Sequence, residues 1–175
     1  AAFYHSVPLW LMELWKNEYG MDTAVKLIEN IDAERFPVIR VNTLKTDRDT
    51  LKVKLAELGV DTEYGQLSKD ALRTAKGADL KYLPAEIQEL FTVQEESSQL
   101  VAYVLNPAEH SLVLDICAAP GGKTTHIAQL MNNTGKVYAS DLYDHKVNLI
   151  RQNAERLALS NVIAEKKDGV RWGED

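Results

Sequence analysis

The feature that most constrains the fold of this chain is the alternation of apolar and amphipathic segments in its C-terminal half. Three short apolar runs, at 112–117, 137–141 and 162–166, have the length and composition of buried strands. Two segments with helical periodicity separate them, at about 123–131 and 144–157. The apolar face of the second helical segment consists of Val147, Ile150, Ala154 and Leu157. Strands and helices that alternate in this way form right-handed βαβ units, so the sequence predicts a parallel sheet and the beginning of a doubly wound α/β fold.

Residues 6–30 have the pattern of two short helices. Ser6 is a candidate cap for the first helix, Pro8 suits an early helical position, and Gly20 suits the end. The second helix has an apolar stripe at helical spacing, formed by Met21, Ala24, Val25 and Ile28. We expect this stripe to serve packing.

A small α+β region follows. The β-rich stretch at 36–44 precedes Thr46-x-x-Asp49, a signature of a helix start. Gly59 ends this helix, and 60–64 favours a second strand. The helix has an apolar stripe formed by Leu51, Leu55 and Leu58.

These patterns predict a helical lead-in at 1–35, a small α+β subdomain at 36–92, and an α/β domain at 93–175 that starts with a helix at 95–105. In a doubly wound sheet the first strand lies in the middle. The strand at 112–117 therefore keeps one edge unpaired within this chain, and an exposed edge can self-associate. We expect the 175 residues to be part of a longer protein.

Composition excludes several classes of protein. Hydrophobic residues make up 45% and charged residues 26%, which is typical of a globular domain and not of a disordered chain. We expect no membrane segment, because no apolar run approaches the ~18 residues of a span. A single cysteine excludes an internal disulfide and a cysteine-based zinc site, and it favours a reducing cytoplasm. We expect no metal, because the histidines lack ligand spacing; they are His5, His110, His126 and His145.

The most informative stretch lies where the first strand of the α/β region gives way to a helix, Leu114-Asp-Ile-Cys-Ala-Ala-Pro-Gly-Gly-Lys-Thr-Thr125. Gly121 and Gly122 lack a Cβ, so the backbone can approach a ligand closely. The helix that follows presents free N–H groups and the positive end of its dipole. This arrangement predicts a ligand site at the carboxyl end of the sheet.

Two kinds of nucleotide loop compete for this stretch. The P-loop pattern G-x-x-x-x-G-K-[ST] is nearly met, but Cys117 replaces its first glycine. Asp141 ends the second strand about 20 residues beyond Gly122, where a carboxylate binds ribose hydroxyls. Asp168, just past the third strand, is placed to accept from an adenine amino group. The loop and the two carboxylates together favour an adenosine without phosphate, such as S-adenosylmethionine, although a strand-end Asp can equally cap the next helix.

The glycine loop, preceded by Val93-Gln-Glu-Glu-Ser-Ser98, resembles the RNA cytosine-C5 methyltransferase family, and Val7-Pro-Leu-Trp-Leu11 and Ile39-Arg-Val-Asn42 extend the similarity. The resemblance implies the N-terminal part of a Rossmann-like methyltransferase domain behind an RNA-recognition-like subdomain. It implies S-adenosyl-L-methionine as cofactor and 16S small-subunit ribosomal RNA as substrate. It assigns the nucleoside to Asp141 and Asp168. The implied cofactor loop consists of Cys117, Ala118, Ala119, Pro120, Gly121, Gly122 and Lys123.

The family chemistry implied here uses a cysteine thiolate that adds to C6 of the target cytosine, and a second cysteine that assists release. Both cysteines lie in later motifs, Asp-Ala-Pro-Cys and Thr-Cys, and neither motif occurs in this sequence. Cys117 is the sole thiol and belongs to the cofactor loop, so no residue here is assigned a catalytic role. We expect this chain alone to bind cofactor weakly, if at all, and not to methylate RNA.

A local excess of positive charge lies between Arg35 and Lys54, in a chain whose net charge is −6. Arg40 and Lys45 are therefore candidate contacts to the RNA backbone. A solvated helix face is an equally good explanation. Two other functions remain open at this point: a P-loop-type nucleotide-binding protein, and a non-catalytic RNA-binding fragment.

Overall fold

The computed structural model describes residues 6–31, 36–75 and 77–171. Contacts divide the chain into two compact units, Ala1–Arg35 and Phe36–Asp175, and each is described by itself. His5 and Arg35, which the sequence analysis named, lie outside the described residues.

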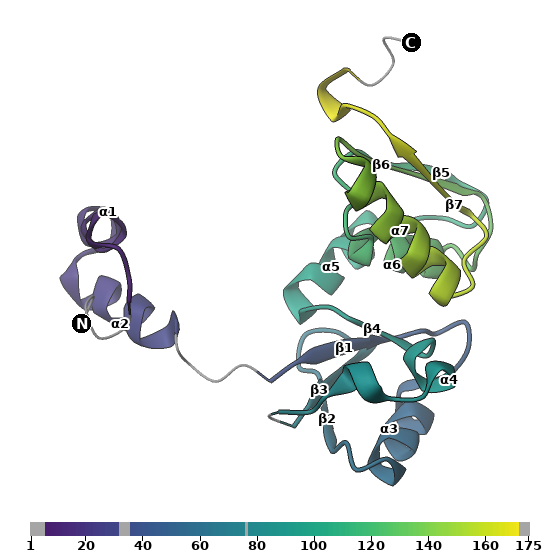
Figure 1. Ribbon diagram of the computed structural model, residues 1–175, viewed down its shortest axis with the longest axis horizontal. Coiled ribbons are helices and arrows are strands. Elements are labelled where there is room, and N and C mark those ends of the chain that lie inside the picture. Colours follow the sequence, from purple (N-terminus) through teal and green to yellow (C-terminus); the bar gives the residue numbers. More distant parts are fainter. Residues whose placement is uncertain (1–5, 32–35, 76, 172–175) are drawn as a thin grey trace. The chain divides into compact units, whose positions relative to one another are not determined.

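The first unit is a pair of helices, α1 (Leu9–Tyr19) and α2 (Met21–Ile31), joined at Gly20 (Figure 1). Gly20 has a φ of +80°, a conformation that glycine adopts without a Cβ clash. On the predicted stripe of α2, Ala24 and Ile28 are buried. The predicted capping role of Ser6 is wrong, because Pro8 occupies the N-cap position and no side chain caps α1.

The second unit begins with a four-stranded antiparallel sheet in the order β2-β3-β1-β4 (Figure 1). The chain runs β1, helix α3, β2, β3, a short helical segment and β4, which is the ferredoxin-like split βαβ arrangement. The strands are β1 (Val38–Val41), β2 (Thr62–Tyr64), β3 (Ala71–Thr74) and β4 (Phe91–Val93); the helical segments are α3 (Arg48–Glu57), the 3-10 turn η1 (Leu80–Tyr82) and α4 (Ala85–Gln88).

One face of this sheet packs on α3. The stripe predicted for this helix supplies Leu51 and Leu55, which are fully buried against Ile39 of β1 and Leu72 of β3. The capping residue is Asp47 and not Thr46, because the Asp47 carboxylate accepts the backbone N–H of Thr50 at 2.8 Å.

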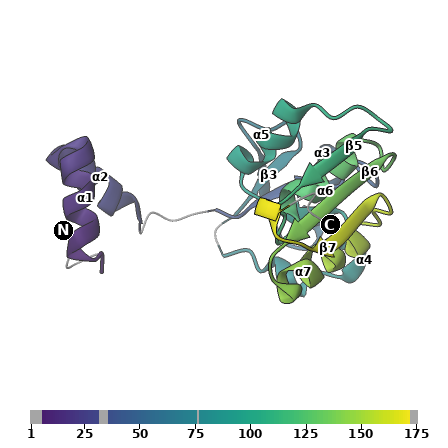
Figure 2. The ribbon, with the colours of Figure 1, turned by 90° about the horizontal axis from the view of Figure 1, so that it is seen from above.

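The rest of the unit contains the predicted parallel sheet, in the order β5-β6-β7, with its strands side by side in Figure 2. Its elements are α5 (Glu96–Leu105), β5 (Leu112–Asp115), α6 (Gly122–Leu130), β6 (Lys136–Asp141), α7 (Asp144–Arg156), β7 (Val162–Lys166) and the 3-10 turn η2 (Gly169–Arg171). Both α6 and α7 pack on the sheet, where Ala128 and Ala154 join Val137 in one apolar cluster. The α/β fold class predicted from the alternating pattern is confirmed.

Within the described part of the chain, β5 pairs with β6 alone, so its other edge is open. Leu112 and Leu114 of this strand are 71% and 45% exposed. Self-association through this edge stays a prediction. Among residues 6–31, 36–75 and 77–171, no helix is long and apolar enough to cross a membrane.

Buried polar side chains join the two sheets of the second unit. Asn42, fully buried after β1, donates from Nδ2 to the carbonyl oxygens of Glu89 (3.0 Å) and Leu157 (3.3 Å). Arg156 of α7 donates from Nη1 to the carbonyl oxygen of Phe91 at 2.7 Å. The two sheets are therefore linked by specific hydrogen bonds as well as by apolar contact.

We expect Leu55→Ala to lower the free energy of unfolding by about 2–5 kcal/mol, because it opens a cavity under α3. Leu58→Ala, which changes the same residue type next to the helix at a site that is 44% exposed, is the control and should cost less than about 1 kcal/mol. Urea unfolding followed by circular dichroism measures both. Leu58 is the one member of the predicted stripe that the structure leaves exposed, and equal losses in the two variants would contradict the burial of Leu55.

Candidate functional site

The glycine loop connects β5 to α6 and is held firmly on both sides. Gly121, the N-cap residue of α6, has a φ of +102°, and a Cβ there would lie 3.3 Å from Cα of Ile150 in α7. The N–H of Ala118 donates to the carbonyl oxygen of Ser140 at 2.9 Å. On the opposite side, Asn153 of α7 donates from Nδ2 to the carbonyl oxygen of Pro120 at 2.8 Å, after the cis Ala119–Pro120 bond. The positive φ and the close approach of α7 both favour glycine at position 121.

A cleft of about 220 Å³ lies over this loop. Its lining comes from the loop, from the end of β5 and from the segment that joins β4 to α5: Val93, Gln94, Glu95, Ser98, Asp115, Cys117, Ala118, Ala119, Pro120, Gly122 and Lys123. The structure thus brings six of the seven predicted loop residues to one cleft. The seventh, Gly121, is buried behind the loop against α7.

Asp141 lies at the same edge of the sheet as the glycine loop. Strands β5 and β6 are parallel with Asp115 opposite Ala139, so the carboxyl ends of both strands meet at this edge. The Asp141 side chain is 12% exposed, and its carboxylate is 3.7 Å from Nζ of Lys146. The N-cap residue of α7 is Tyr143, and no side chain caps this helix, so Asp141 is not used as a cap. Its second oxygen makes no hydrogen bond within the described residues.

Asp168 follows β7 and has a structural role as well. Its Oδ1 accepts the N–H of Val170 at 3.0 Å and so caps the 3-10 turn η2. The neighbouring residue lies against the glycine loop, because a Cβ on Gly169 would be 3.0 Å from the carbonyl oxygen of Ile116. The turn after β7 is therefore next to the turn after β5, but only one Asp168 oxygen is left for a ligand.

Two further polar residues line the cleft whose place there the sequence did not predict. Asp115, at the end of β5, accepts the hydroxyl of Thr124 through Oδ2 at 2.7 Å. Gln94 is 7% exposed, and its Nε2 has no hydrogen-bond partner among the described residues. Both residues lie in the sequence segments that resemble the methyltransferase family. The resemblance therefore included Gln94 and Asp115 but indicated no function for either side chain.

The geometry disfavours a P-loop. In a P-loop the hydroxyl that follows the lysine faces a bound Mg²⁺. Here that residue is Thr124, which is fully buried and whose hydroxyl donates to Asp115. No group of three or more His, Cys, Asp or Glu side chains that could hold a metal ion occurs in the described ranges.

The structure contradicts the predicted RNA contact of Arg40. Its side chain is 1% exposed and is used within the protein, where Nη1 donates to the carbonyl oxygen of Gly122 at 2.7 Å.

Other basic residues of this stretch also make contacts within the protein. Lys45 is partly exposed, but its Nζ forms an ion pair with Oε2 of Glu89 at 2.6 Å. Arg48 and Lys52 lie over the ring of Tyr64 at 4.4 and 5.5 Å from its centre. The positive run in the sequence is therefore divided among separate internal contacts, and the RNA contact of Lys45 stays a prediction.

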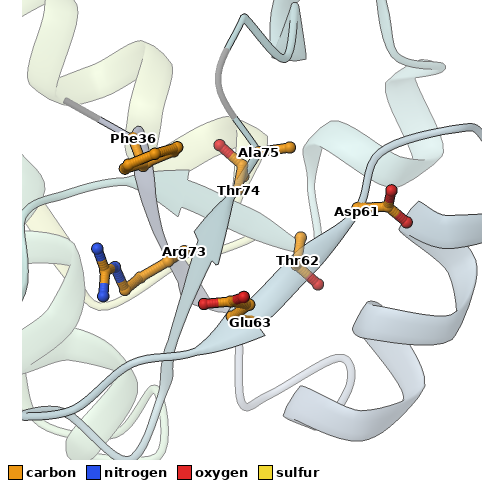
Figure 3. A pocket seen from close by; sticks show the side chains of 7 residues that line it. All are labelled: Phe36, Asp61, Thr62, Glu63, Arg73, Thr74 and Ala75. Atoms are coloured by element: carbon orange, nitrogen blue, oxygen red, sulfur yellow. The ribbon is translucent and has the colours of Figure 1, made fainter. Parts of the chain in front are cut away.

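A larger hollow, of about 420 Å³, lies elsewhere, at the β2–β3 end of the four-stranded sheet. Figure 3 shows the ring of Phe36 at one side of it and the Asp61 carboxylate at the other. Its lining is Phe36, Asp61, Thr62, Glu63, Arg73, Thr74 and Ala75. None of these residues belongs to the glycine loop or follows β6 or β7, so this hollow is separate from the predicted cofactor site.

His126 is buried in α6, the helix that follows the glycine loop. Its ring lies edge-on to the ring of Tyr103, with 4.9 Å between the centroids. Burial, together with the nearby charges of Arg40 and Lys69, lowers the pKa of His126 to about 3. The imidazole is therefore neutral at physiological pH.

The parallel sheet and the cleft have the architecture of a Rossmann-like methyltransferase domain, with a glycine loop after the first strand, Asp141 at the end of the second and Asp168 after the third. Known families agree with this class. The model described as 16S rRNA methyltransferase RsmB/F matches residues 102–174, and the model described as the RsmF/B-like ferredoxin-like domain matches residues 7–81. The chain belongs to this family of RNA methyltransferases.

Individual relatives are similar over nearly the whole chain. A probable ribosomal RNA small subunit methyltransferase B of Bacillus subtilis is 41% identical over 97% of this chain, and this chain spans 38% of that relative. The human 28S rRNA (cytosine(4447)-C(5))-methyltransferase is 34% identical over 96% of this chain and 21% of its own length. The crystal structure of a methyltransferase homologue from Pyrococcus horikoshii superposes with a TM-score of 0.84 at 28% identity, covering 99% of this chain and 57% of that one.

The depressed pKa of His126 predicts a specific loss of stability in mild acid. Below its ordinary pKa of 6.5 the unfolded chain binds a proton that the folded chain excludes down to about 3. The free energy of unfolding should therefore fall by about 1.4 kcal/mol per pH unit between pH ~6.5 and ~5 from this group. His126→Phe keeps a ring against Tyr103 and should remove this slope, whereas substitution of the exposed His110 should retain it. Urea titrations across this pH range measure the slopes, and an unchanged slope in His126→Phe would contradict the assignment.

Proposed function

We propose that this chain is the cofactor-binding part of an S-adenosylmethionine-dependent RNA cytosine-C5 methyltransferase that acts on 16S ribosomal RNA. The observation that carries the proposal is the Asp141 carboxylate, which is not used as a helix cap and lies at the same sheet edge as the glycine loop. A carboxylate at the end of the second strand suits ribose hydroxyls and would repel a triphosphate. Membership of the family supports the same reading.

The chain's own residues hold the cofactor in this proposal. The N–H groups of the first turn of α6, near Gly122, favour the cofactor's carboxylate. Asp141 accepts the ribose hydroxyls, and the free oxygen of Asp168 accepts the adenine amino group. Bound there, S-adenosylmethionine supplies a methyl group on a sulfonium centre. Cys117 lines the cleft as part of the loop, and we assign it no nucleophilic role.

The RNA partner is proposed from the relatives. The curated relatives of this chain in Bacillus subtilis and human are both described as ribosomal RNA methyltransferases. A bacterial-type substrate of this kind fits the cytoplasmic location that the single cysteine favours. Lys45, which is partly exposed beside Glu89, is the remaining candidate for an RNA backbone contact.

The ribose assignment predicts that Asp141→Asn lowers the affinity for S-adenosylhomocysteine about 10- to 100-fold, because hydrogen bonds to a charged acceptor are worth about 1.5–3 kcal/mol. Asp144→Asn is the matched control. It removes a carboxylate three residues away that pairs with Lys166 at 2.7 Å on the exposed face of α7, and it should change the affinity less than about twofold. Titration calorimetry measures both variants. Equal affinities would contradict the assignment, and binding of ATP in place of S-adenosylhomocysteine would favour a P-loop-type protein.

The lack of the two family cysteines also predicts what this chain can catalyse by itself. The 175-residue chain has one cysteine, in the cofactor loop, so it should form no 5-methylcytosine when incubated with cofactor and 16S RNA. Mass spectrometry of the digested RNA detects the product, and a curated full-length relative serves as the positive control. Product formed by this chain would show that Cys117 or another route supplies the nucleophile. Strongly salt-dependent RNA binding with no response to cofactor would favour the non-catalytic RNA-binding fragment.

A further inference from the structure

We propose that Arg40 is a positioning residue for the cofactor loop. Through Arg40 the four-stranded sheet fixes two parts of the cleft lining, the first turn of α6 and the Gln94 side chain. The role in cofactor affinity rests on the proposed function; the role in loop order does not. Arg40 lies on β1, the strand hydrogen-bonded on both sides, to β3 and to β4. It is therefore anchored to a rigid part of the sheet.

The guanidinium of Arg40 contacts one face of α6 over two turns. Nη1 donates to the carbonyl oxygen of Gly122 at 2.7 Å, and Nη2 donates to Oγ1 of Thr125 at 3.0 Å. Nε donates to Oε1 of Gln129 at 3.2 Å. Gly122 is the first residue of α6 and lines the cleft, so the arginine holds the helix where the loop ends.

The same guanidinium also holds a second segment of the cleft lining. Nη1 also donates to Oε1 of Gln94, which lies between β4 and α5. This bond orients the amide of Gln94, whose Nε2 would lie 3.6 Å from a Cβ on Gly122. Arg40 therefore joins two segments of the cleft that are separated in the sequence by the whole of α5 and β5.

The contacts require the fork of an arginine. Four acceptors lie around the three nitrogens of the planar Arg40 guanidinium. A lysine at this position would offer a single nitrogen, which cannot reach both Gly122 and Gln129. All four acceptors are neutral, and burial lowers the pKa of Arg40 to about 9, so the group is still charged at neutral pH. A charged group this deeply buried persists only where its donors are satisfied, so the surrounding acceptors have little freedom to move.

Hydrogen exchange tests the positioning role without any ligand. In Arg40→Lys, the amides of Ala118, Gly121 and Thr125, whose hydrogen bonds order the loop and the first turn, should exchange at least tenfold faster than in the unsubstituted chain. Asn42→Ala is the matched control. Asn42 lies on the same segment, is equally buried and also links the two sheets, but it bonds Glu89 and Leu157 and not the loop. Its effect on these three amides should stay below threefold.

Affinity for S-adenosylhomocysteine provides the second measurement, made at a temperature where every variant is folded. Arg40→Lys should weaken binding at least fivefold, and Asn42→Ala less than twofold. Thr125→Val removes one acceptor while keeping the shape of the side chain, and it should accelerate the same amides even if Arg40→Lys does not fold. Exchange in Arg40→Lys or Thr125→Val that matches Asn42→Ala would overturn the proposal. The exchange result decides the role of Arg40 whether or not the unsubstituted chain binds S-adenosylhomocysteine, whereas the proposed function is tested by the affinity of Asp141→Asn.

Discussion

A buried guanidinium must be surrounded by acceptors, and in this protein that requirement is met where the two sheets of the second unit meet. Arg40 is 1% exposed and bonds to groups from α6 and from the segment before α5. Losing any acceptor would leave part of the charge unsatisfied in a medium of low dielectric, which costs more than an ordinary surface contact. The four-stranded antiparallel sheet and the parallel sheet are therefore coupled at the place where the glycine loop ends.

The cleft depends equally on the parallel arrangement of β5, β6 and β7. Because the strands run in one direction, three successive turns gather at one edge, and each contributes a different chemical group. The first supplies backbone N–H groups, the second supplies Asp141 and the third supplies Asp168. Contacts between the turns fix their spacing: Ala118 bonds to Ser140, and Gly169 lies against Ile116. A ligand that needs all three groups thus meets a preformed surface.

Sequence periodicity was sufficient to predict the helices and strands that bury one continuous apolar face. The helices α5 to α7 and the strands β5 to β7 appear within one or two residues of their predicted bounds. β3 and β4, of four and three residues, were missed. β1 and β2 are equally short, but the helix-start signature at Thr46 and the helix stop at Gly59 marked their positions in the sequence. Arg40 was misassigned for a different reason. Alternation along β1 places it on the face opposite Ile39, but a local pattern does not reveal that α6 covers that face. The partners of a buried polar residue come from distant segments, here more than 50 residues away.

The same limit explains why Asp141 and Asp168 looked equivalent in the sequence. Both follow a strand, and both could have capped the next helical segment. The structure separates them: Asp168 caps η2, whereas α7 begins at Asp144 with Tyr143 as its N-cap and leaves Asp141 unused. The Asp141 carboxylate contributes no helix cap, although it lies at the same sheet edge as the glycine loop. Its ion-pair partner among the described residues is Lys146, whose Nζ is 3.7 Å away. The helix gains nothing from this group, so the structure gives more support to the proposed ligand contact at Asp141 than at Asp168. Under the proposed function, discrimination between nucleosides should therefore depend more on the ribose than on the base.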